Sequence, residues 1–276
     1  MTATTAHSAS VWRYMQKCAQ VDWPELDVTL TPVTDHWASL AIAGPHARDL
    51  LMALEPDFDV SREALPFAAV RQGQLSGIPV RVFSVSFSGE LSYEINVPAG
   101  FAEDFFDLVM DRGSRWNITP YGLETLDVLR IEKGHLAIGG EIDGRHTAKD
   151  LGLGRMVSAK KDLIGRALAQ RPALQAEGRE ELVGLVPEDR TEAIPPASCL
   201  STEPMDAGGC AAIQGYLTAA VKSPTLGHSV ALAFLKDGHA RTGDQLWAHS
   251  TIAKRSVKVR VVPSCFYDPE GEKVHG

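Results

Sequence analysis

Residues Ser88-Gly-Glu-Leu-Ser-Tyr-Glu-Ile95 form a glycine turn that leads into a β-strand. Two carboxylates, Glu90 and Glu94, lie four residues apart, and the period of two along a strand predicts that they share one face. The spacing leaves two interpretations open. Both carboxylates can belong to a solvated edge-strand face, or one can be held to accept two parallel N–H donors from a heterocycle, the geometry of strong charge-assisted pairs.

The sequence on either side of this turn predicts further strands. Residues 67–97 alternate between apolar and polar side chains and are interrupted by glycines, which indicates an antiparallel β region. A shorter alternating segment at residues 37–42 predicts another strand. Gly44-Pro45 follows it and is typical of a strand that turns directly into a helix.

Helical periodicity appears in four places and alternates irregularly with the strands. Apolar residues recur at three- and four-residue spacing along 11–18, 47–54, 101–109 and 123–130, and Gly134 is expected to end the last helix. Because strands and helices mix without strict βαβ alternation, we predict an α+β fold for this part of the chain.

The second part of the chain changes character after a polar segment at residues 166–179. Short apolar or alternating runs then follow, separated by Gly, Pro and Asp, which is the pattern of a small all-β barrel. We therefore predict two domains, residues 1–178 and 179–276. The predicted strands of the barrel are 182–186, 211–218, 230–234, 245–248 and 257–261.

Composition excludes several classes of protein. The 276 residues carry a formal net charge of −8, which argues against a general nucleic-acid binder. We find no apolar run long enough for a membrane helix and no signal peptide after Met1, so we expect no membrane partner and a cytoplasmic location. The cysteines, residues 18, 199, 210 and 265, form neither a C-x-x-C pair nor a dense framework, and we expect free thiols and no metal site.

The common catalytic signatures are missing, so no catalytic residue is assigned. Gly152-Leu-Gly154 lacks the third glycine of a dinucleotide fingerprint, and no phosphate-binding G-x-x-x-x-G-K-[ST] loop occurs. Ser88 lacks the leading glycine of a nucleophile elbow. These absences weigh against phosphoryl transfer and serine hydrolysis.

Five motifs follow one another along the chain. They are Ser86-Phe-Ser-Gly-Glu-Leu-Ser-Tyr-Glu-Ile-Asn-Val-Pro98, Pro120-Tyr-Gly122 with Leu129-Arg-Ile-Glu-Lys-Gly134, Ser158-Ala-Lys-Lys-Asp-Leu-Ile-Gly165, Ser223-Pro-Thr-Leu-Gly227 and Phe266-Tyr-Asp-Pro-Glu-Gly271. Together they resemble the aminomethyltransferase-like (glycine-cleavage T-protein) region of the α subunit of heterotetrameric sarcosine oxidase, and the resemblance covers essentially the whole chain. Phe-Ser-Gly-Glu, where T-proteins usually have Tyr-Thr-Gly-Glu, and the last motif point to the sarcosine oxidase branch.

The resemblance implies a folate-binding aminomethyltransferase domain, N-terminally incomplete, followed by the family's C-terminal β-barrel domain. It implies that the chain binds tetrahydrofolate as substrate and captures the one-carbon unit from flavin-dependent oxidation of sarcosine, with glycine, 5,10-methylenetetrahydrofolate and hydrogen peroxide as products. By the same resemblance, Glu94 grips the pterin together with Thr2 or Thr4 in a Thr-rich opening strand. FAD, FMN and NAD are expected only on a missing portion or on partner subunits of the oxidase.

Two departures from the family pattern keep alternatives open. The chain begins after the family's flavin-binding portion and after a strand whose aspartate is thought to aid imine chemistry, so it resembles a truncated subunit. The T-protein arginine that aligns with Leu126 is also absent. A non-catalytic folate-binding or assembly module and a free-standing aminomethyltransferase are therefore the alternative hypotheses.

Overall fold

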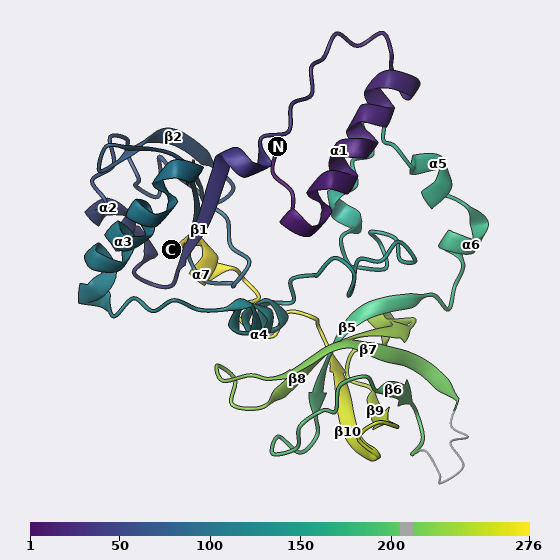
Figure 1. Ribbon diagram of the computed structural model, residues 1–276. Helices are drawn as coiled ribbons and strands as arrows, with labels where there is room; N and C mark the ends of the chain where they lie inside the picture. Colours follow the sequence, from purple (N-terminus) through teal and green to yellow (C-terminus); the bar gives the residue numbers. More distant parts are fainter. Residues whose placement is uncertain (205–211) are drawn as a thin grey trace. The chain divides into compact units, whose positions relative to one another are not determined.

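The computed structural model describes residues 1–204 and 212–276, and the chain divides into two units (Figure 1). The first comprises residues 1–86, 91–119 and His275, and the second comprises residues 87–90, 120–274 and Gly276. Cys210 and the start of the predicted strand 211–218 lie outside the described residues.

The first unit contains a four-stranded antiparallel sheet in the order β1-β4-β3-β2, which confirms the predicted β region. A tight turn joins β2 to β3 at Ser76 and Gly77, both of which have positive φ. The strands are β1 (Trp37–Ala43), β2 (Val70–Leu75), β3 (Ile78–Phe83) and β4 (Ser92–Pro98).

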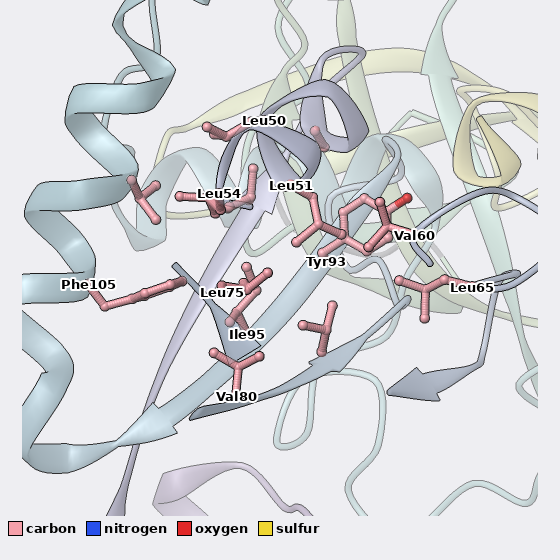
Figure 2. Close-up of a cluster of buried hydrophobic side chains, with 14 of the residues drawn as sticks. Leu50, Leu51, Leu54, Val60, Leu65, Leu75, Val80, Tyr93, Ile95 and Phe105 are labelled. Carbon is pink, nitrogen blue, oxygen red and sulfur yellow. The ribbon is translucent and has the colours of Figure 1, made fainter. Parts of the chain in front are cut away.

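Strand β4 contributes alternate side chains to the core of this unit. Tyr93, Ile95 and Val97 are fully buried and join the core cluster drawn in Figure 2. Helices α2 (Ala47–Ala53) and α3 (Ala102–Gly113) supply its other side, as their apolar spacing predicts. Each large side chain buried in this way contributes about 1.5–3 kcal/mol to folding.

The opening segment of the first unit differs from the sequence prediction. The described chain has no strand before Trp37, and residues Thr5–His7 form a 3₁₀ turn that leads into α1 (Ser8–Lys17) and a π-helical turn, Cys18–Asp22. The prediction of a Thr-rich opening strand is therefore wrong, because a strand needs a neighbour to satisfy its backbone groups and this segment pairs with no strand among the described residues. The helix itself is confirmed, although none of the α1 residues is buried.

The first helix of the second unit is α4 (Leu123–Lys133), which ends at Gly134 as predicted. Gly134 adopts a left-handed conformation with φ 76°, and its N–H bonds the carbonyl of Ile131 at 3.0 Å. Short helices follow at α5 (Arg166–Ala169) and α6 (Pro172–Gln175), and α7 (Glu272–His275) lies at the C-terminus.

The rest of the second unit is a closed six-stranded barrel with the order β10-β5-β8-β7-β6-β9. The predicted all-β barrel is confirmed, with one additional three-residue strand that is too short for alternation to reveal. The strands are β5 (Glu180–Pro187), β6 (Cys199–Ser201), β7 (Ile213–Lys222), β8 (Ser229–Lys236), β9 (Gln245–Ser250) and β10 (Arg255–Val262).

Strand β8 is buried on both faces, which explains its continuous apolar sequence. Ala231, Ala233 and Leu235 belong to the cluster inside the barrel, whereas Leu232 and Phe234 pack outside it with Ile131 of α4. Residues 120–178 thus pack with the barrel in the second unit, whereas our predicted domain boundary lies after residue 178.

Candidate functional site

Glu94 lies in the middle of β4, on the sheet face opposite the core. Its neighbours Tyr93 and Ile95 are both fully buried, and Glu94 itself is half-buried. Because side chains alternate along a strand, the Glu94 carboxylate points to the face opposite the core, while its neighbours on either side pack in the core. The backbone at this position is fixed on both sides, because Glu94 pairs with Ala41 of β1 and Phe83 of β3.

Two side chains hold one oxygen of the Glu94 carboxylate. Ser39 Oγ donates to Oε1 at 3.2 Å, and Asn96 Nδ2 donates to the same oxygen at 3.3 Å. Ser39 and Asn96 face each other in register across β1 and β4. Within the described residues no donor reaches Oε2, so this second oxygen stays available to a ligand.

An aromatic ring and a cation occupy the same sheet face. Arg81 pairs in register with Asn96, and its guanidinium lies 4.0 Å from the centroid of the Trp37 ring, a cation–π distance. We call Trp37, Ser39, Arg81, Glu94 and Asn96 the Glu94 face. Its chemistry suits a planar ligand with N–H donors for the carboxylate.

The structure does not bring the two candidate threonines to this face by any described interaction. Thr2 and Thr4 are exposed and precede the first 3₁₀ turn, and the carbonyl of Thr4 accepts a 3.0 Å hydrogen bond from His7 N. Neither is hydrogen-bonded to Glu94 in the described part of the chain. Their role in folate binding remains a prediction.

Glu90 does not share a strand face with Glu94, so that prediction is wrong. β4 begins at Ser92, and residues 87–90 belong to the second unit, where Tyr267 donates to Glu90 Oε1 at 2.6 Å. The period-of-two rule fails here because it applies only within a continuous strand. This hydrogen bond, with burial second, raises the pKa of Tyr267 to about 12.

Three of the motifs meet at Glu132, which is almost fully buried in the second unit. Ser223 Oγ donates to Glu132 Oε1 at 2.5 Å and Thr225 Oγ1 donates to Oε2 at 2.9 Å. The backbone carbonyl of Glu132 accepts hydrogen bonds from Phe266 N and Tyr267 N. The Ser-Pro-Thr-Leu-Gly motif therefore contributes to the internal structure of this unit.

Lys133 joins the C-terminal motif to the same helix. Its ammonium lies 2.9 Å from Asp268 Oδ2, and both side chains are more than nine-tenths buried. Gly89 fits beside it, since a Cβ at residue 89 would lie 3.0 Å from the Lys133 side chain. Phe-Ser-Gly-Glu and Phe-Tyr-Asp-Pro-Glu-Gly are thus packed together through Lys133.

Sequence reasoning missed Ser39 and Asn96. Asn96 lies two residues beyond Glu94, so strand periodicity could have placed it on the same face. Ser39 is 55 residues from Glu94, and only the register of β1 against β4 brings it there.

The described residues form neither a metal-binding cluster nor a membrane-spanning helix. No group of three or more His, Cys, Asp or Glu side chains is arranged to hold a metal ion. No helix in the described ranges is long and apolar enough to cross a membrane.

Comparison with known proteins gives matches along the whole chain. The sarcosine oxidase subunit alpha of Rhizobium meliloti (strain 1021) is 43% identical over 282 residues, which cover 100% of this chain and 28% of that protein. The aminomethyltransferase of Cutibacterium acnes is 31% identical over 92% of this chain and 66% of its own length. The chain therefore spans little more than a quarter of its sarcosine oxidase relatives.

Solved structures and family profiles agree with this fold. The crystal structure of glycine cleavage system aminomethyltransferase T from Bartonella henselae superposes with a TM-score of 0.74 at 19% identity, covering 95% of this chain and 67% of that one. The profile of the GCVT N-terminal domain matches residues 1–161, and that of the glycine cleavage T-protein C-terminal barrel domain matches residues 181–268. With both profiles in order on one chain, this protein belongs to the glycine cleavage T-protein family and resembles the corresponding part of the sarcosine oxidase α subunit.

Proposed function

We propose that this chain is the tetrahydrofolate-binding module of a sarcosine oxidase α subunit. It receives the one-carbon unit produced when sarcosine is oxidatively demethylated, and the products are glycine, 5,10-methylenetetrahydrofolate and hydrogen peroxide. The observation that carries the proposal is the half-buried Glu94 carboxylate, whose Oε2 accepts no hydrogen bond from the described residues. It lies in a chain that is 43% identical to 28% of such a subunit.

Glu94 recognises the pterin ring in this proposal. A ring N–H and the adjacent exocyclic amine form two parallel donors, and a carboxylate accepts such a pair through short charge-assisted hydrogen bonds. Thr2 or Thr4 is proposed to add a further contact to the ligand. The recognition orients tetrahydrofolate so that its two amine nitrogens take up the methylene group of the imine.

The oxidation itself requires a flavin, which passes two electrons from sarcosine to oxygen and so yields the imine and hydrogen peroxide. We assign the flavin, and any nicotinamide cofactor, to the part of the relatives outside the matched 28% or to partner subunits of the oxidase. Transfer of the methylene group from the imine to tetrahydrofolate returns two hydrogens to the nitrogen and releases glycine.

A free-standing aminomethyltransferase is the second candidate function. It is supported by the similarity to the Cutibacterium acnes enzyme. Leu126, a half-buried residue of α4, stands where the T-protein pattern has arginine, which weighs against a T-protein-like contact to folate. The Phe-Ser-Gly-Glu and Phe-Tyr-Asp-Pro-Glu-Gly motifs favour the oxidase branch. A non-catalytic folate-binding or assembly module remains the third candidate.

Calorimetric titration of the 276-residue chain with 5-formyltetrahydrofolate tests the proposal. We expect saturable binding with one ligand per chain. We also expect no sarcosine-dependent peroxide from the flavin-free chain and no ammonia release from an aminomethyl-lipoyl protein. Absence of folate binding by a cooperatively folded chain would contradict the proposed function, and ammonia release would support the free-standing aminomethyltransferase instead.

A further inference from the structure

The two donors to Glu94 Oε1 differ in their surroundings, although both belong to the Glu94 face. Asn96 is only 9% exposed, whereas Ser39 is an exposed side chain on the sheet's edge strand β1. The Asn96 amide is therefore held by its packing. The Ser39 hydroxyl can turn toward water without leaving a buried polar atom unpaired.

The lone pairs of the Glu94 carboxylate limit how many hydrogen bonds it can accept from a ligand. A carboxylate oxygen has two lone pairs, and in this structure Oε1 already accepts from both Ser39 and Asn96. A ligand that offers two parallel N–H donors finds Oε2 open, but it must replace one donor at Oε1. The exposed Ser39 hydroxyl is the donor that can leave at low cost.

We propose that Asn96 is a positioning residue that fixes the Glu94 carboxylate for a paired N–H donor ligand, and that the Ser39 hydroxyl gives up its place at Oε1 when the ligand binds. The inference rests on the proposed folate function and adds a residue to it. By holding Oε1, Asn96 sets the plane of the carboxylate before the ligand arrives, which removes part of the ordering cost of binding.

Substitution of Asn96 by Asp provides the sharpest test, because the shape is kept while a donor to Oε1 becomes an acceptor. Two ligands are titrated against each variant: 5-formyltetrahydrofolate, and an analogue with a methyl group in place of the exocyclic amine of the pterin. In the unaltered chain we expect loss of the amine to weaken binding at least 10-fold, as expected for a hydrogen bond to a charged group. We define the amine ratio as the dissociation constant of the analogue divided by that of 5-formyltetrahydrofolate. In Asn96→Asp this ratio should fall to about 1–3.

The amine ratio compares the two ligand affinities and so distinguishes a positioning role of Asn96 from a merely structural one. A weakened sheet would lower the affinity for both ligands equally, whereas a misdirected carboxylate loses the contribution of the amine alone. Gln72→Glu is the matched control, since Gln72 is exposed on β2 and pairs in register with Arg81, so it adds the same charge to the same sheet away from Glu94. We expect it to leave the ratio unchanged.

Three further measurements complete the test. Asn96→Ala, which adds no charge, should also lower the ratio, and it serves if Asn96→Asp does not fold by circular dichroism. Ser39→Ala should change the affinity for 5-formyltetrahydrofolate by no more than about 3-fold. A retained ratio in both folded Asn96 variants, or a larger effect of Ser39→Ala than of Asn96→Ala, would overturn the inference. If the unaltered chain itself fails to bind 5-formyltetrahydrofolate, the proposed function fails instead.

Discussion

Single residues of the motifs have two kinds of role in this chain. Glu132 has both carboxylate oxygens occupied by Ser223 and Thr225 inside the second unit, so it stabilises the fold. Glu94 keeps one oxygen open to a ligand. Both glutamates belong to motifs that carry the family resemblance, and their hydrogen-bond partners distinguish the structural Glu132 from Glu94, for which we propose a binding role.

At this scale we predict a pH dependence from Tyr267. The hydrogen bond to Glu90 and burial raise its pKa to about 12, from about 10 for a free tyrosine. The neutral hydroxyl is therefore favoured in the folded state, and its stabilisation is complete below pH 10 and lost between pH 10 and 12. The unfolding free energy lost in Tyr267→Phe should be about 1–2 kcal/mol at pH 8 and should shrink toward zero as the pH approaches 12.

Urea unfolding of both proteins at a series of pH values measures this difference. In a Glu90→Gln background the pH-dependent part should shrink but persist, because burial alone still raises the pKa of Tyr267. A constant difference from pH 8 to pH 12 would show that the Tyr267 to Glu90 hydrogen bond does not govern the titration.

Individual helices and strands were predicted correctly where the spacing of apolar residues matches the side chains that are buried. The alternation of β3 and β4 and the apolar spacing of α2 and α3 correspond to side chains that are buried in the core. Predictions failed where partners distant in sequence decide the structure. The Thr-rich opening segment pairs with no strand in the part of the chain that the structure describes, and Glu90 lies outside β4 because residues 87–90 pack in the other unit.

The site was predictable only in part for the same reason. The resemblance and the strand pattern together singled out Glu94. The identity of its donors depends on the register of Ser39 opposite Asn96, and this register is set by the packing of the whole sheet.

At the scale of an element, we predict that Gly134 is required to end α4. It has φ 76°, and a Cβ there would lie 2.4 Å from the carbonyl oxygen of Ser264. Gly134→Ala combines the cost of a left-handed conformation, about 1–2 kcal/mol, with an overpacking cost of about 1–3 kcal/mol. Gly139 has φ 90° but open space around it, so Gly139→Ala should show the first cost alone. Equal losses of unfolding free energy in the two variants would contradict the role of Ser264.

The whole molecule consists of two units. The main part of the second unit begins at Pro120, whereas the sequence predicts a domain boundary after residue 178. Ile131 of α4 packs with Leu182 and Phe234 of the barrel, and half-buried Leu136 and Leu151 join the same cluster. Burial of such side chains contributes about 1.5–3 kcal/mol each when complete. The barrel strands alone therefore lack part of their hydrophobic cover.

We accordingly predict that a fragment of residues 120–276 is more stable than a fragment of residues 179–276. The shorter fragment exposes Leu182 and Phe234 and leaves Ser223 and Thr225 without Glu132. Urea unfolding of both fragments measures the difference. The same unfolding midpoint for both would instead support residue 178 as the boundary of an independent folding unit.

The central claim, that Glu94 recognises the paired N–H donors of a folate, is tested most directly by calorimetric titration of Glu94→Gln with 5-formyltetrahydrofolate. The Gln carbonyl can replace Oε1 and keep the hydrogen bonds from Ser39 and Asn96, which places the amide NH₂ at the open position where it meets the donors of the ligand. We predict an affinity roughly 10- to 150-fold weaker, as expected when a charge-assisted hydrogen bond worth about 1.5–3 kcal/mol is lost. Glu103→Gln, at an exposed position on α3, makes the same charge change and should bind like the unaltered chain. Equal affinities for Glu94→Gln and the unaltered chain would contradict the account and return Glu94 to a solvated strand face.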